Sequence, residues 1–97
     1  MQLQPGQIDE YRRRHNPIWP ELEQTLREHG VQTYSIFLHP GTLQLFAIAE
    51  IESEERWAAI AQTATCRKWW AYMREVMDAN EDNSPASVEL EEVFRLP

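Results

Sequence analysis

The sequence is poor in cysteine, glycine and histidine. Its one cysteine, Cys66, has no partner for an internal disulfide and no second thiol for a redox or metal pair. We interpret it as a half-buried helical residue. Three glycines leave no glycine-rich phosphate loop, and His15, His29 and His39 lack metal-ligand spacing. We therefore expect no metal and no nucleotide cofactor.

Basic residues are also scarce, because 9 Lys and Arg stand against 16 Asp and Glu, for a net charge of -7. A nucleic-acid or anionic-membrane partner requires a basic face, so both are disfavoured. No run of about 18 apolar residues is present, and the first residues lack the pattern of a secretory signal. We expect a cytoplasmic protein.

The composition that remains is that of a folded domain, with 42% hydrophobic and 26% charged residues. Its 97 residues fit one domain over 1–97. Hydrophobic periodicity and turn residues divide this domain into alternating elements. In chain order we predict the end of a strand at 1–3, helices at 7–15 and 18–30, strands at 33–38 and 43–51 joined by a turn, a helix capped by Ser53, a helix at 65–77, a loop at 78–85 and a strand at 87–96.

This order predicts an α+β fold of the ferredoxin-like, split βαβ type, in which helices cover one face of an antiparallel sheet. The second hairpin strand is apolar at nearly every position, so its other face also needs a cover. Large exposed apolar faces are uncommon on monomers. We therefore predict a homodimer that packs through the open face of the sheet.

Tyr11 and His15 are four residues apart on the first predicted helix, so their side chains share one face near its end. Pro17 interrupts the helix directly afterwards. One interpretation makes His15 a polar helix-terminal residue that bonds a last-turn carbonyl. The other makes it a general acid or base, the commonest catalytic role of a histidine that titrates near neutral pH.

Trp69 and Trp70 are adjacent on a predicted helix, where successive side chains point about 100° apart. The two side chains therefore cannot both lie at the centre of the core. Aromatic rings stack on the C–H faces of sugars, although an aromatic stripe is more often core. We assign Trp19 and Trp57 to the core or an interface.

These segments together resemble the L-rhamnose mutarotase family from about residue 2 to residue 97. The most specific stretches read RHNPIWPE and WWAYM, followed by NEDNSP, and the chain ends in VFRLP. The resemblance implies a cofactor-free, dimeric, ferredoxin-like enzyme that interconverts the α and β anomers of L-rhamnose. It also implies that His15 is the proton donor and that four aromatic residues contact the sugar, namely Tyr11, Tyr34, Trp69 and Trp70.

Mutarotation needs an acid at the ring oxygen and a base at the anomeric hydroxyl. The sequence leaves the base open between a tyrosine, a carboxylate such as Glu21, and a bound water. Asp82 or Asn83 would either hydrogen-bond sugar hydroxyls or cap their own loop. Glu89, Glu91 and Glu92 fall on the last predicted strand and are interpreted as a solvated face rather than a glycosidase pair.

The sequence departs from the family at its start, where only residues 1–3 represent an apolar strand, so we expect that strand to be truncated. Two alternatives to the mutarotase remain. One is a non-catalytic dimeric module that binds a small metabolite in the same pocket. The other is a cofactor-free monooxygenase, which needs a mostly apolar pocket, whereas Tyr11, His15 and Tyr34 around one cavity would favour a sugar.

Overall fold

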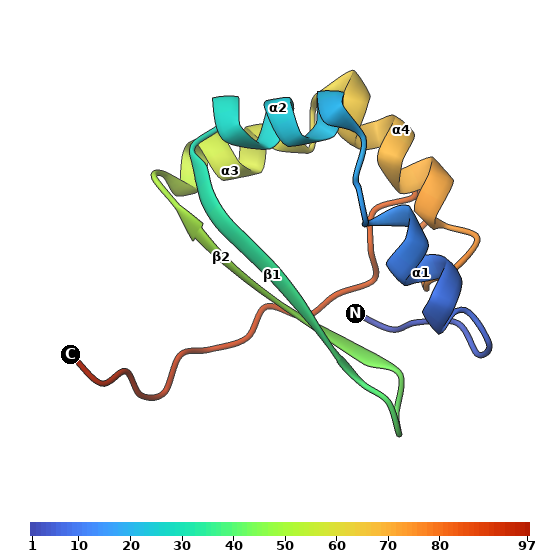
Figure 1. Cartoon of the computed structure of the whole chain (residues 1–97). Helices are drawn as coiled ribbons and strands as arrows, with labels where there is room; N and C mark the ends of the chain where they lie inside the picture. The colour runs from blue at the N-terminus through green and yellow to red at the C-terminus, as the bar shows by residue number, and fades with distance from the viewer.

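The computed structural model describes residues 1–97 and contains four helices and one two-stranded antiparallel sheet (Figure 1). This arrangement confirms the predicted α+β class. None of the helices has the length and apolarity that crossing a bilayer requires. The elements are α1 (Ile8–Arg14), α2 (Pro20–Glu28), β1 (Val31–His39), β2 (Gln44–Ile51), α3 (Glu54–Ile60) and α4 (Ala64–Met73).

The helix ends follow local chemistry that is visible in the sequence. Pro20 occupies the first turn of α2, where its missing N–H costs nothing, and Gly30 follows that helix with φ of +85°. The Ser53 hydroxyl accepts a hydrogen bond from the Arg56 N–H at 3.2 Å, which confirms the predicted cap of α3. Thr63 caps α4 in the same way.

The α4 helix is shorter than predicted, because it ends at Met73 instead of continuing to residue 77. The reason is that the following residues pair elsewhere. The Val76 carbonyl accepts a hydrogen bond from the Gln4 N–H at 2.8 Å, and Leu3 forms an antiparallel bridge with Met77. Pairing with the start of the chain therefore replaces the last predicted helical turn.

The hairpin of β1 and β2 is confirmed, with Phe37 opposite Phe46 and Leu38 opposite Leu45. Residues 1–3 lie beside it, because the Met1 carbonyl accepts from the Leu45 N–H at 2.8 Å. The same short segment pairs with the stretch after α4 on its other side. It therefore joins the hairpin to the residues after α4, through isolated bridges where the end of a strand was predicted.

One face of the hairpin packs toward the helices, which lie along one side of it (Figure 1). The side chains that alternate with these point outward, and among them Phe37 is 56% and Ile48 is 64% exposed. The main core joins the chain start, α1, α2, β2, α4 and the residues after α4. Its buried members are Leu3, Tyr11, Leu22, Leu45, Trp69, Met73, Val76 and Met77.

The predicted strand at residues 87–96 is wrong, because this segment forms no strand in the structure. Its first residues border the space between the hairpin and the helices, and the chain then crosses the hairpin and extends away from the body of the molecule to the C-terminus (Figure 1). Strands are stable only when a neighbour pairs their backbone groups, and no strand of the same chain is placed to do so. Its apolar side chains are accordingly left in solvent, with Val88 82% exposed.

Candidate functional site

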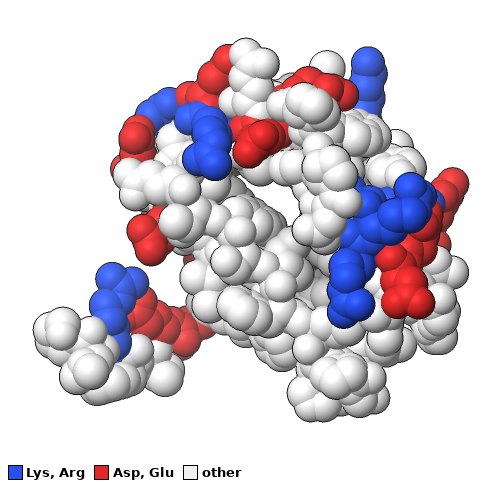
Figure 2. Space-filling view, viewed as in Figure 1, with Lys and Arg blue, Asp and Glu red and all other residues white.

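A cavity of about 1540 Å³ lies between the inner face of the hairpin and the helices. Figure 2 shows an opening in the middle of one face, bordered mainly by uncharged residues, with charged side chains gathered toward the outside. Small-molecule sites usually occupy about 300–1000 Å³. One monosaccharide would therefore fill only part of this space. All five residues predicted for the site line this one cavity: Tyr11, His15, Tyr34, Trp69 and Trp70.

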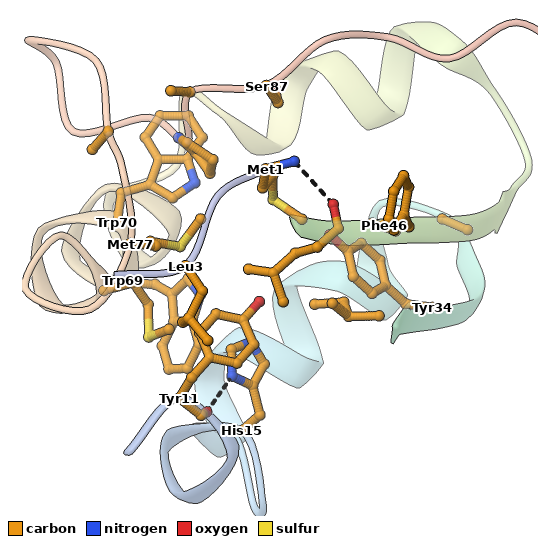
Figure 3. Close-up of a pocket in the computed structure, with 18 of the residues that line it drawn as sticks. Met1, Leu3, Tyr11, His15, Tyr34, Phe46, Trp69, Trp70, Met77 and Ser87 are labelled. Carbon is orange, nitrogen blue, oxygen red and sulfur yellow. Dashed lines mark hydrogen bonds between the residues drawn. The ribbon is translucent and has the colours of Figure 1, made fainter. Parts of the chain in front are cut away.

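Tyr11 and His15 enter the cavity from the end of α1, as their spacing predicts. Their ring centroids are 4.3 Å apart, and the His15 Nδ1 lies 2.9 Å from the Tyr11 carbonyl oxygen (Figure 3). A carbonyl only accepts, so Nδ1 carries the proton and donates it. The other ring nitrogen, Nε2, is then the atom left to exchange protons with a bound molecule.

Both of these side chains have perturbed proton affinities. Burial lowers the pKa of His15 from its ordinary 6.5, and the hydrogen bond to the Tyr11 carbonyl opposes that change only in part. Burial also raises the pKa of Tyr11, with a smaller contribution from Tyr34. At neutral pH the imidazole is therefore mainly neutral, and the Tyr11 hydroxyl keeps its proton.

The two tryptophans of α4 have different environments, as their 100° separation predicts. Trp69 is buried in the main core, with its ring edge-on to Trp19 at 5.1 Å and to His15 at 5.2 Å. Trp70 is half-buried and borders the cavity (Figure 3). Trp69 thus supports the imidazole from the core side, and Trp70 offers an aromatic surface to a ligand.

Tyr34 reaches the cavity from β1, across from the α1 end of the site (Figure 3). Its ring stacks on Trp57 of α3, with centroids 5.9 Å apart and an interplanar angle of 27°. Of the two places predicted for Trp57, the core is wrong, because Trp57 is 36% exposed and lines the cavity. Ile60 alone is buried on α3.

The loop after α4 satisfies most of its own hydrogen bonds. The Asp82 Oδ1 accepts from the Ser84 N–H at 2.9 Å and from the Ser84 hydroxyl, and this bonding lowers the Asp82 pKa. The Asn83 Oδ1 accepts from Arg74 at 2.6 Å, and Asn83 also borders the cavity. The structure thus assigns Asp82 to loop capping and leaves Asn83 at the rim of the site.

Few other groups in the cavity have acid or base chemistry. Burial raises the pKa of the Cys66 thiol to about 11, so it is protonated and unreactive at neutral pH. Glu21 does not line the cavity, and Glu89 is the one carboxylate that does. No group of three or more His, Cys, Asp or Glu side chains is placed to hold a metal ion.

Sequence reasoning missed several polar residues of the cavity wall. Arg12 and Asn16 flank His15, and Arg74 and Asn80 lie after α4. The spacing of α1 gives the signal for Arg12, because a residue four positions after Ile8 shares the face of Tyr11 and His15. The wall otherwise remains largely hydrophobic, with 28 of its 39 residues in that class.

Comparison with known proteins adds to this geometry. A family model described as L-rhamnose mutarotase matches residues 1–96. L-rhamnose mutarotases of Shigella flexneri serotype 5b and Escherichia coli K12 are 60% and 59% identical over 97 residues, which is 100% of this chain and 93% of each relative. The crystal structure of an L-rhamnose mutarotase from Formosa agariphila superimposes with a TM-score of 0.90 at 41% identity, over 100% of this chain and 93% of that one.

Proposed function

This chain belongs to the L-rhamnose mutarotase family, and we propose that it interconverts the α and β anomers of L-rhamnose through acid–base opening and closing of the pyranose ring. The observation that carries this mechanism is the convergence of Tyr11, His15 and Tyr34 on one cavity beside Trp70. Hydroxyl and imidazole groups can bind sugar hydroxyls, and the aromatic ring can cover an apolar sugar face.

We assign the acid step to Nε2 of His15. The imidazolium gives its proton to the ring oxygen, the bond between that oxygen and the anomeric carbon breaks, and the anomeric hydroxyl loses a proton to become the aldehyde oxygen. Rotation about the adjacent carbon–carbon bond and the reverse steps give the other anomer. Because its pKa is lowered, the imidazolium is the minor form of His15 at neutral pH, but it is a stronger acid than a free imidazolium.

We propose that a bound water accepts the proton of the anomeric hydroxyl. Tyr11 does not serve, because burial keeps its hydroxyl protonated, and the same effect raises the pKa of Tyr34. Glu21 stands outside the cavity wall, and Glu89, the one carboxylate on that wall, is an exposed residue of the C-terminal segment. The two tyrosine hydroxyls instead orient the sugar by hydrogen bonding, and Trp70 stacks against the ring face and methyl group.

The first test is the exchange of L-rhamnose anomers, measured by NMR saturation transfer with and without the purified protein. We expect the protein to accelerate exchange in proportion to its concentration, with no added metal or cofactor. Binding of L-rhamnose without acceleration would instead support the non-catalytic binding module. Absence of both, in a protein shown to be folded, would refute the proposed function.

We propose further that two copies form a ferredoxin-like dimer. The outward face of the hairpin exposes Phe37, Phe46 and Ile48 together, and the C-terminal segment exposes a second apolar group that includes Val88 and Leu90. Both are surfaces that a monomer would leave in water at a cost of about 25 cal/mol per Å². A second copy can cover them and also close the oversized cavity.

Light scattering after size-exclusion chromatography tests this assembly. We expect a mass of twice 11.5 kDa, which persists on dilution to micromolar concentration. Phe37→Glu should shift the protein toward the single-chain mass, because a charge on the packed face would lose its water without gaining a partner. A wild-type protein that runs as a monomer at all concentrations would exclude the dimer.

We also propose that the reaction proceeds without a cofactor in the cytoplasm. Every step is a proton transfer or a carbon–oxygen bond change, so no redox or group carrier is required. The buried, protonated Cys66 is compatible with the reducing conditions of that compartment.

A further inference from the structure

Arg14 is the one charged residue among the 13 buried residues, with 9% of its surface exposed. It lies on the last turn of α1, directly before His15. Removing a guanidinium from water is unfavourable unless its donors are paired. The groups that pair with the Arg14 guanidinium therefore show which parts of the fold this buried residue connects.

These contacts run from α1 to the end of α4. The Arg14 Nη1 donates to the Tyr72 carbonyl, Nη2 donates to the Glu75 Oε2 at 2.8 Å, and Nε donates to the Glu10 Oε2 at 3.0 Å. The guanidinium carbon lies 4.1 Å from the centroid of the Tyr72 ring, in cation–π geometry. One side chain thus fastens the carboxyl end of α1 to the carboxyl end of α4.

Tyr72, which Arg14 contacts, is connected through Trp69 to His15, the proposed acid. The Tyr72 ring packs on Trp69 with centroids 5.7 Å apart, and Trp69 presents its ring edge-on to His15 at 5.2 Å. The α1 helix has only seven residues, a length that is not stable without tertiary contacts. The direction in which His15 points therefore depends on what anchors this short helix.

We propose that Arg14 is a positioning residue that holds the His15 imidazole against Trp69 and so sets the direction of Nε2 into the cavity. This inference rests on the proposed role of His15 as the acid. The planar guanidinium, with its several N–H donors in fixed directions, is needed for this role. The reason is that its three acceptors, the Tyr72 carbonyl and the carboxylates of Glu10 and Glu75, lie on different sides of it. Lysine supplies the charge but not this geometry.

The test compares Arg14→Lys and Arg14→Met with Arg27→Met, which removes an exposed arginine from α2. We expect Arg14→Lys to fold and to bind L-rhamnose with KM within twofold of wild type, while kcat falls about tenfold or more, since a small misplacement of a catalytic group is costly. The side-chain NMR signals of His15 should shift in both Arg14 variants and stay unchanged in Arg27→Met.

Two outcomes would overturn the proposal. A folded Arg14→Lys variant with wild-type kcat and unchanged His15 signals would show that the guanidinium geometry is not needed to position His15. An Arg14→Lys variant that fails to fold would assign Arg14 a purely structural role, whatever happens to Arg14→Met. Failure of the proposed function is a separate result, because the wild-type protein would then show no acceleration of anomer exchange.

Discussion

The replacement His15→Ala should remove most of the acceleration of L-rhamnose anomer exchange, lowering kcat roughly 100- to 10,000-fold. The reason is that His15 is the one histidine in the cavity wall, and neither tyrosine hydroxyl is acidic enough to replace its imidazolium. Saturation transfer measures the rate, and circular dichroism establishes whether the variant folds.

A matched control is His29→Ala. His29 also follows a helix, and its Nδ1 lies 2.7 Å from the carbonyl of Thr25 four residues earlier, which repeats the local geometry of His15. It does not line the cavity. The exchange rate should therefore be unchanged in His29→Ala. Equal losses in the two variants, or a folded His15→Ala with the wild-type rate, would contradict the assignment of the acid.

Trp69→Ala should cost about 3–5 kcal/mol of folding free energy, the usual range for a buried aromatic residue. Trp69 contacts Trp19, Tyr72 and His15 at ring centroid distances of 5.1 to 5.7 Å, so its removal leaves a void in the main core. Because small domains have only about 5–15 kcal/mol of stability, urea denaturation should show a large fall in the midpoint.

Trp70→Ala is the natural comparison, since it changes the adjacent residue of the same helix. Trp70 is half-buried beside the cavity, so we expect a smaller loss of stability and a clear rise in the L-rhamnose concentration needed for half-maximal rate. If the exchange rate of Trp70→Ala depends on L-rhamnose concentration as in the wild type, Trp70 contributes to packing and does not contact the sugar. Equal destabilisation by the two replacements would contradict their different environments.

Much of the local structure could be predicted from residues that act on their immediate neighbours. Ser53 caps α3, Gly30 ends α2, and the turn after His39 closes the hairpin, although α2 begins at Pro20 and not at the predicted residue 18. In each case a side chain or a dihedral preference is satisfied within a few residues. Such effects are visible in one sequence without knowledge of distant contacts.

The errors arose where distant segments decide the structure. Residues 74–77 have helical periodicity, but Met77 forms a bridge with Leu3, and the Val76 carbonyl accepts a hydrogen bond from the Gln4 N–H. Residues 87–96 alternate as a strand should, yet no neighbouring strand exists within the chain. A pattern of hydrophobicity records which residues prefer burial, and it does not say which partner buries them.

The site was predicted in part by spacing and in part by resemblance. The separation of Tyr11 and His15 indicated a shared face, and the adjacency of Trp69 and Trp70 indicated different environments. Their convergence with Tyr34, which comes from β1, could not follow from spacing, because helix and strand are brought together only by the tertiary fold. The role of Trp57 was missed because an amphipathic pattern does not distinguish a core from a cavity wall.

The group that orients His15 is a backbone carbonyl, since Nδ1 lies 2.9 Å from the main-chain oxygen of Tyr11. A carboxylate partner would disappear with a single codon change, whereas every amino acid at position 11 supplies the same carbonyl. The tautomer of the proposed acid is thus insulated from side-chain mutation at that position. The side chain at position 11 can therefore change, for example toward another sugar preference, while the hydrogen bond that orients the His15 imidazole is kept.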